Sequence, residues 1–123
     1  MTRMSSKHLE LGRMGENYAA DYLSQLGYKI IERNIRLPEG EIDIIAIHDK
    51  SLIIIEVKTR RDNRFGEGYQ AVNAKKQKKL RLLALSYLQT HIEYRLPIRF
   101  DVVSLLVAPS GELRELKHFP RAF

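Results

Sequence analysis

The sequence predicts an α/β domain, because segments with helical periodicity alternate with runs of β-branched residues. Residues 7–26 and 71–89 carry apolar side chains at spacings of three and four, which is typical of helices with one buried face. Residues 28–36, 41–60 and 98–107 are rich in Ile and Val, as expected of strands. A chain of 123 residues is long enough for a single domain that buries its own core.

Composition narrows the class of protein further. The chain contains no cysteine, which excludes a disulfide framework and a thiolate metal site. Its longest apolar runs, residues 44–47 and 52–55, are far shorter than the ~20 residues of a membrane-spanning helix. Residues 1–16 contain no apolar segment of signal-peptide length. We therefore expect a soluble, cytoplasmic protein without a membrane partner, in which residues 1–8 form a flexible N-terminal segment.

Positive charge is concentrated in one part of the chain. The formal net charge is +6 at pH 7, with 21 Lys and Arg against 15 Asp and Glu. Residues 58–81 alone contain nine basic and two acidic residues, a local charge of +7. Such a concentration indicates a polyanionic partner such as nucleic acid.

The first predicted helix, residues 7–26, has an apolar stripe with Glu16 on its flank, and we expect it to end at Gly27. At 100° per residue Glu16 lies next to Leu23, where a carboxylate could lean over a sheet. A side chain that merely interacts favourably with the helix dipole is the simpler interpretation. The stripe consists of Leu11, Met14, Tyr18, Tyr22 and Leu26, with Ala19 and Leu23 beside it.

Strands are expected on both sides of the second helix. The strand of residues 28–36 leads through a turn at residues 37–40 into a strand–turn–strand unit, residues 41–60. After the helix, residues 98–107 form another apolar strand, and residues 112–119 form a last edge strand. Within residues 98–107, Asp101 shares a face with Arg99, which predicts an internal ion pair.

The strand–turn–strand unit brings two acidic side chains together. If residues 49–50 form a two-residue turn, the antiparallel register places Asp43 directly opposite Glu56. Opposed side chains have Cβ atoms roughly 4.5–5.5 Å apart, and like charges there repel. The pair therefore requires a cation, a shared proton, or the neighbouring Lys58 to neutralise it.

A hard divalent ion such as Mg²⁺ fits this pair best, because Mg²⁺ is commonly held by one or two carboxylates together with water and phosphate. Alternation predicts that Asp43 shares a face with Ile45 and Ile47. Glu41 is a candidate outer partner, although a surface role is simpler. The alternative for the whole unit is a solvated hairpin edge with ordinary ion pairs.

Basic residues follow directly after the carboxylates. Residues 59–69 are expected to form a mobile loop, whose arginines and Phe65 could contact phosphates and stack on a base; solvated loop charges are the alternative. The second helix, residues 71–89, carries its positive charge in its N-terminal half, against the helix dipole, a cost that a phosphate partner would offset. Its basic residues are Lys75, Lys76, Lys78, Lys79 and Arg81, and its apolar stripe is Leu80, Leu83, Ala84, Tyr87 and Leu88.

These motifs resemble those of known proteins. Asp43, followed after twelve residues by Glu56-Val57-Lys58, resembles the PD-(D/E)xK signature of restriction-endonuclease-like nucleases. An ordered set of shorter motifs resembles the YraN-like uncharacterised bacterial family, which is similar to archaeal Holliday-junction resolvases. The set is Gly12-x-x-Gly15-Glu16, Asn34-Ile-Arg36, Gly40-Glu-Ile-Asp43, Glu56-Val-Lys-Thr-Arg60, Phe65-Gly66, Arg99-Phe-Asp101 and the Ala122-Phe123 ending.

The resemblance implies a restriction-endonuclease-like α/β fold, a central mixed β-sheet flanked by helices in the order α-β-β-β-α-β-β. It also implies a metal-dependent nuclease that hydrolyses phosphodiester bonds and is structure-selective on DNA, with a homodimer as a further expectation. Asp43, Glu56 and the Val57 carbonyl would hold Mg²⁺ or Mn²⁺, with Glu16 as an additional candidate, and Lys58 would be the catalytic lysine. The residues expected to bind nucleic acid are Arg60, Arg61, Arg64, Lys75, Lys76, Lys78 and Lys79.

Two other functions fit the same residues. A nuclease fold without turnover would bind DNA or RNA in a salt-dependent way that chelators do not affect. A basic protein-interaction domain would use the carboxylates and the lysine only as an internal ion-pair cluster.

Overall fold

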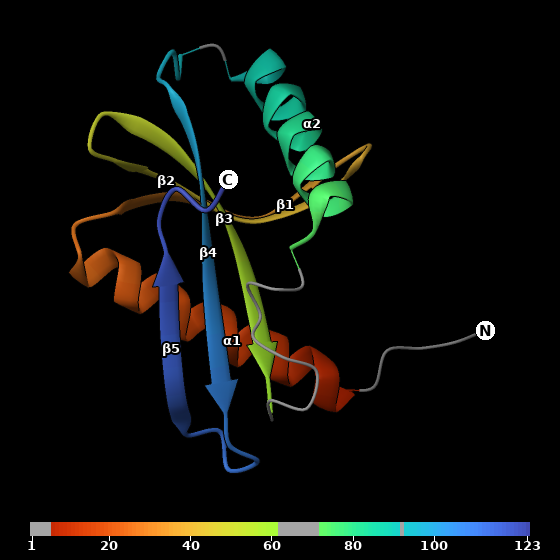
Figure 1. Cartoon of the computed structure of the whole chain (residues 1–123), viewed down its shortest axis with the longest axis vertical. Helices are drawn as coiled ribbons and strands as arrows, with labels where there is room; N and C mark the ends of the chain where they lie inside the picture. Colours follow the sequence, from red (N-terminus) through yellow and green to blue (C-terminus); the bar gives the residue numbers. More distant parts are fainter. Residues whose placement is uncertain (1–5, 62–71, 92) are drawn as a thin grey trace.

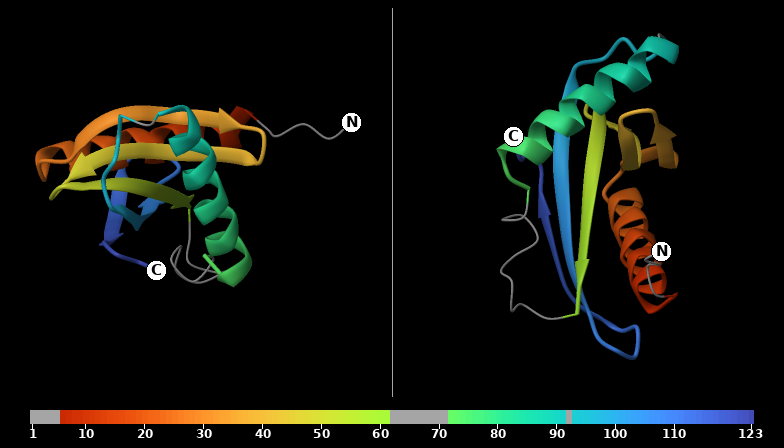
Figure 2. Two further views of the ribbon diagram at one scale, coloured as in Figure 1. Left: turned by 90° about the horizontal axis from the view of Figure 1, so that it is seen from above. Right: turned by 90° about the vertical axis from the view of Figure 1, so that its right-hand side faces the viewer.

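The computed structural model describes residues 6–61, 72–91 and 93–123. In this part of the chain a five-stranded sheet carries one helix on each face (Figures 1 and 2). The elements are α1 (Ser6–Gln25), β1 (Lys29–Leu37), β2 (Gly40–His48), β3 (Ser51–Arg60), α2 (Ala74–Thr90), β4 (Ile98–Val107) and β5 (Leu113–Phe119).

The strands lie in sequence order across the sheet. β3 and β4 are parallel, whereas the other neighbouring pairs are antiparallel. Parallel neighbours need a crossover connection, and α2 lies on that connection. The predicted order of helices and strands, the mixed sheet and the edge position of β5 are therefore confirmed.

Each helix covers a separate apolar core. Leu11, Ala19 and Leu23 of α1 pack with Ile44 and Ile55 on one face of the sheet. On the other face the predicted α2 stripe is confirmed: Leu80, Leu83, Ala84 and Tyr87 are buried, and Leu88 packs at the edge of the same core. Neither helix of the described residues is long and apolar enough to cross a membrane.

The boundaries of the helices differ from the predicted ones for local reasons. α1 begins at Ser6, inside the segment predicted to be flexible. It ends before Leu26, which is 49% exposed instead of belonging to the stripe, because the chain turns at Gly27 with φ +93°. α2 begins at Ala74, three residues later than predicted, because the Asn73 side chain caps it by accepting the backbone N–H of Lys76 at 3.0 Å.

The expected loop after the carboxylates also begins later. Thr59 and Arg60 belong to β3, where they pair with Leu105 and Leu106 of β4. The remainder of that loop, residues 62–69, lies outside the described residues.

The predicted ion pair of Arg99 with Asp101 is confirmed, with a distance of 3.0 Å between Nε and Oδ1. The Asp101 carboxylate also accepts hydrogen bonds from the Tyr28 hydroxyl (2.7 Å) and His118 Nε2 (2.8 Å). Burial alone would raise the pKa of Asp101, but the hydrogen bonds from His118, Arg99 and Tyr28 hold the pKa below its ordinary value. This network joins β4, β5 and the start of β1.

α1 crosses β3 at a point where the Thr59 side chain leaves no space for a side chain on the helix. A Cβ atom on Gly15 would lie 2.7 Å from the Cβ of Thr59, whereas a Cβ on Gly12 would meet nothing within 4 Å. Gly15 therefore sets the distance at which α1 lies over the sheet.

We expect Gly15→Ala to lower the free energy of unfolding by about 1–3 kcal/mol, because the Thr59 Cβ can move only with its strand. Gly12→Ala is the matched control on the same helix and should raise it by about 0.5–1 kcal/mol through helix propensity. Urea unfolding followed by circular dichroism measures both. Equal stability of the two variants would contradict the close contact.

Candidate active site

The register of the β2–β3 hairpin follows from its turn. Asp49 (φ 50°) and Lys50 (φ 58°) are both left-handed, which defines a two-residue type I′ turn. His48 pairs with Ser51, and the ladder continues in the same register to Ile44 opposite Ile55. The predicted register is therefore confirmed from the turn to this pair, which is directly adjacent to Asp43 and Glu56 in the hairpin.

Asp43 is held against β3 by a backbone hydrogen bond. Its Oδ2 accepts the N–H of Val57 at 2.8 Å. Burial and the neighbouring charge of Glu56 raise the pKa of Asp43 to about 7, although the Val57 N–H acts in the opposite direction. The two carboxylates are therefore within electrostatic reach of each other.

The face on which Asp43 lies differs from the prediction. Ile45 and Ile47 belong to the core beneath α2, whereas Asp43 lines a groove beside α1 together with Glu16. The alternation of faces is broken here. Ile42 and Ile44 are two residues apart and would share a face in a regular strand, but they lie in opposite cores. The break lies between the β1–β2 pairs Arg33–Ile44 and Ile35–Ile42, next to Asn34. Asn34 has a left-handed φ of 53°, which a regular strand does not allow.

Glu16 leans over the sheet from α1. It is only 8% exposed, and its Oε1 accepts hydrogen bonds from Arg33 Nε and Asn34 Nδ2, both at 2.9 Å. Its charge adds a smaller contribution to the raised pKa of Asp43. Sequence reasoning missed Arg33 and Asn34 as its partners, although the polar run Glu32-Arg33-Asn34 between Ile31 and Ile35 was a visible signal.

Glu56 is 7% exposed and is neutralised by two ammonium groups. Lys58 Nζ lies 3.8 Å from Oε1, and Lys76 Nζ lies 3.6 Å from Oε2. Lys58 is two residues away on the same strand, but Lys76 reaches the carboxylate from α2. The sequence analysis predicts only a nucleic-acid contact for Lys76 and does not predict its contact with Glu56.

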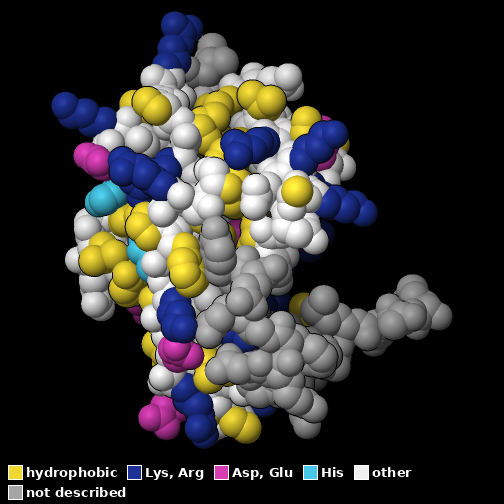
Figure 3. All heavy atoms as spheres, in the orientation of Figure 1, with side chains coloured by type: hydrophobic (Ala, Val, Ile, Leu, Met, Phe, Trp, Pro, Cys, Tyr) yellow, Lys and Arg dark blue, Asp and Glu magenta, His cyan; other side chains and the backbone are white. Residues whose placement is uncertain are grey.

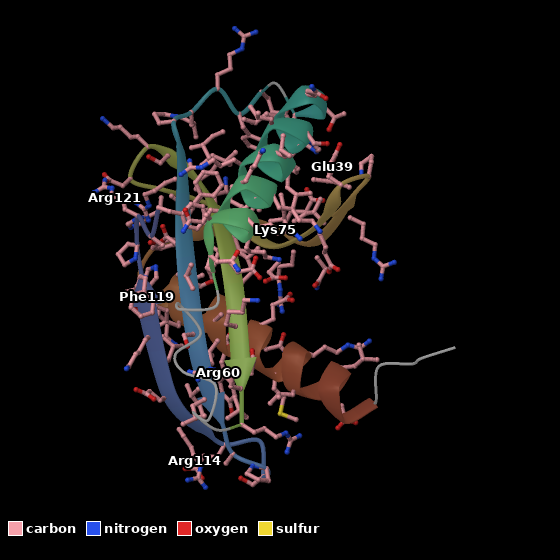
Figure 4. All side chains as sticks on the ribbon, turned by 45° about the vertical axis from the view of Figure 1, so that its right-hand side comes forward. Glu39, Arg60, Lys75, Arg114, Phe119 and Arg121 are labelled. Carbon is pink, nitrogen blue, oxygen red and sulfur yellow. The ribbon has the colours of Figure 1, made fainter. Side chains whose placement is uncertain are left out.

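The other predicted nucleic-acid contacts are more dispersed. Arg60 lies toward the end of β3 and Lys75 at the start of α2 (Figure 4), and an Arg60 Nη donates to Ser104 Oγ of β4 at 3.4 Å. Arg61 is exposed, and Arg64 lies outside the described residues. Lys78 and Lys79 are exposed on α2. On the face of the molecule drawn in Figure 3, Lys and Arg side chains are scattered among hydrophobic and uncharged groups.

The groove beside Asp43 is large enough for a substrate group. Its volume is about 670 Å³. One wall is α1, and the opposite wall consists of the ends of β1, β2 and β3. Its lining residues include Arg13, Glu16, Asn34, Glu41, Asp43 and Lys58.

The donor set can be compared with what a divalent ion requires. Within the described residues, no three His, Asp or Glu side chains come close enough together to hold a metal. Two adjacent carboxylates remain, Asp43 and Glu56, and Mg²⁺ commonly takes only one or two protein carboxylates and completes its shell with water and phosphate. The pair therefore fits a hard divalent ion that shares its coordination with a substrate.

A mixed sheet with a helix on each face and a carboxylate–lysine cluster at the end of its central hairpin defines an α/β protein with a nuclease-like architecture. The chain belongs to uncharacterised protein family UPF0102, whose model matches residues 15–105. UPF0102 is the YraN-like family that the sequence motifs resemble, so that predicted resemblance is confirmed.

Relatives in the family match over nearly their full lengths. A UPF0102 protein of Syntrophotalea carbinolica is 47% identical over 120 residues, 98% of this chain and 96% of its own. Those of Thermodesulfovibrio yellowstonii and Renibacterium salmoninarum are 44% and 43% identical, covering 94% and 89% of this chain and 96% and 92% of their own.

The raised pKa of Asp43 predicts a pH-dependent loss of stability. With a pKa of about 7 in the folded protein against 3.8 ordinarily, the folded state binds more protons between these values, so stability falls as pH rises from about 4 to 7. Asp43→Asn keeps an acceptor for Val57 but cannot ionise. We expect it to raise the free energy of unfolding at pH 8 in EDTA by at least about 1 kcal/mol.

Urea unfolding at pH 5 and pH 8 measures this difference. Asp21→Asn, an exposed position on α1, serves as the control and should keep the wild-type pH profile. An Asp43→Asn profile parallel to that of wild type would show that Asp43 ionises normally.

Proposed function

We propose that this UPF0102 protein is a metal-dependent nuclease that hydrolyses phosphodiester bonds, acts in the cytoplasm and is structure-selective on DNA. The observation that carries the proposal is the convergence of Asp43, Glu56 and Lys58 at one end of the β2–β3 hairpin. Asp43 and Lys58 line a groove of about 670 Å³. The exposed lysines of α2 supply positive charge for the substrate backbone.

In this proposal Asp43, Glu56 and the Val57 carbonyl hold one or two Mg²⁺ or Mn²⁺ ions, with Glu16 as a further candidate ligand. The bound ion would lower the pKa of a water molecule and neutralise charge on the scissile phosphate. The hydrogen bond from the Val57 N–H fixes one oxygen of Asp43. The other oxygen of Asp43 would then coordinate the ion without a rearrangement of the side chain.

Lys58 is the proposed catalytic lysine. Its ammonium lies within 3.8 Å of Glu56 and also lines the groove. A positive charge at this place stabilises negative charge that develops on the phosphoryl oxygens, and it can orient the attacking water.

The remaining basic residues are proposed to hold phosphates that flank the scissile bond. Lys75, Lys78 and Lys79 present exposed ammonium groups along α2, and Arg60, Arg61 and Arg64 belong to the same proposal. Such contacts position a duplex without reading its sequence. A second copy of the chain, bound to the other arm of a branched substrate, is the proposed partner protein.

A second candidate is a nucleic-acid-binding protein without turnover. It is favoured by the two ammonium groups at Glu56, because together they balance the carboxylate charges without a metal ion. This candidate predicts binding that weakens with salt and is indifferent to chelators.

Cleavage of branched, flapped and linear DNA in Mg²⁺ or Mn²⁺ distinguishes the two candidates. We expect EDTA and Asp43→Ala to abolish cleavage and Lys58→Ala to reduce kcat by about 10²-fold or more, by analogy with the loss of a single charge-stabilising donor. Lys117→Ala is the matched control, since Lys117 pairs with Glu115 on β5 at 3.3 Å. It should cut at the wild-type rate.

Gel-resolved rates on each substrate provide the measurement. Cleavage that survives both Asp43→Ala and Lys58→Ala would contradict the assigned roles. Salt-dependent binding without cleavage in any divalent ion would favour the binding protein.

A further inference from the structure

Lys76 is placed by the cap of its own helix. The Asn73 side chain accepts the Lys76 N–H at 3.0 Å and so fixes the first turn of α2. From this turn Lys76 reaches across to β3, where its Nζ lies 3.6 Å from Oε2 of Glu56. The contact therefore joins the basic helix directly to a proposed metal ligand.

One ammonium group lies beside each oxygen of Glu56, and these are the oxygens that a divalent ion would need. Lys58 is close to Oε1 and Lys76 to Oε2. A carboxylate that is nearly buried must be compensated by positive charge, so the ammonium groups serve this purpose while no cation is bound. An ammonium group and a divalent cation at the same carboxylate repel each other, so the binding of one weakens the binding of the other.

Lys76 is the more displaceable partner. The side chains of Lys58 and Lys76 are equally exposed, at 32%. Lys58, however, lies two residues from Glu56 on the same strand, whereas Lys76 belongs to a helix that carries four lysines within the five residues from Lys75 to Lys79. An ammonium on a long flexible stem can swing from one anion to another at little cost. A backbone phosphate held on the exposed lysines of α2 would offer such a second anion.

We infer that Lys76 is a displaceable counter-ion of Glu56, which neutralises the carboxylate in the free protein and transfers to a phosphate oxygen when nucleic acid binds. This inference rests on the proposed function and adds a means of regulation to it. Nucleic acid, by drawing Lys76 away, frees an oxygen of Glu56 for the divalent ion. By linkage, the ion in turn strengthens the binding of nucleic acid.

The first test measures Mn²⁺ affinity without nucleic acid, by electron paramagnetic resonance of the free ion. Lys76→Gln should tighten Mn²⁺ binding about threefold to tenfold, near the lower end of typical coupling between sites, and Lys76→Arg should remain near wild type. Lys75→Gln is the matched control, since it removes the same charge one residue earlier. Among the described residues Lys75 forms no ion pair with Glu56, so its effect should be smaller.

The second test is a double-mutant cycle on the affinity for a linear DNA duplex in EDTA. Glu56→Gln releases Lys76 and should therefore tighten DNA binding. The factor by which it does so should be at least about threefold larger in the wild-type background than in the Lys76→Gln background. Because the cycle cancels the general effect of removing a negative charge, equal factors in the two backgrounds would overturn the transfer of Lys76 to phosphate.

These tests fail separately from the nuclease proposal. If wild type cuts DNA but Lys76→Gln and Lys75→Gln bind Mn²⁺ equally, only the counter-ion role is overturned. If wild type cuts no nucleic acid but Lys76→Gln alone tightens Mn²⁺ binding, the counter-ion role stands and the nuclease does not. Absence of Mn²⁺ binding to every variant would overturn both.

Discussion

The register of the β2–β3 hairpin is the constraint on which the site depends. The type I′ turn at Asp49 and Lys50 fixes which residues of the two strands lie side by side. A slip of one residue would exchange the faces of β3 and would separate Asp43 from the Val57 N–H that it accepts. The helices on either side then add charge to a pair of carboxylates that the hairpin has already brought together.

The second requirement is an irregularity in β1. The left-handed conformation of Asn34 interrupts the alternation of faces beside Asp43, and the same side chain donates to Glu16. The same residue therefore lies at the irregularity beside Asp43 and holds the acidic residue that α1 contributes. Gly15, directly before Glu16, allows α1 to lie close to Thr59 of β3.

Much of the fold followed from periodicity, because both helices bury clear stripes and the strands are rich in Ile and Val. The pairing of β2 with β3 was also predictable, since it depends only on the length of a local turn. The face of Asp43 was not, because alternation assumes a regular strand and Asn34 breaks it. Nor was the contact of Lys76 with Glu56, which depends on how α2 lies across the sheet, a tertiary property without a local signal.

Two buried carboxylates in this protein show how structural and functional charges differ. Asp101 is 1% exposed and accepts hydrogen bonds from the side chains of Tyr28, Arg99 and His118, so its charge is satisfied permanently. Glu56 is nearly as buried, but its partners are flexible ammonium groups at 3.6–3.8 Å. Exchange of such partners costs little, whereas Asp101 is held by side-chain hydrogen bonds of 2.7–3.0 Å from three different residues. The hairpin carboxylates, and not Asp101, are therefore the ones suited to take up a cation and release it.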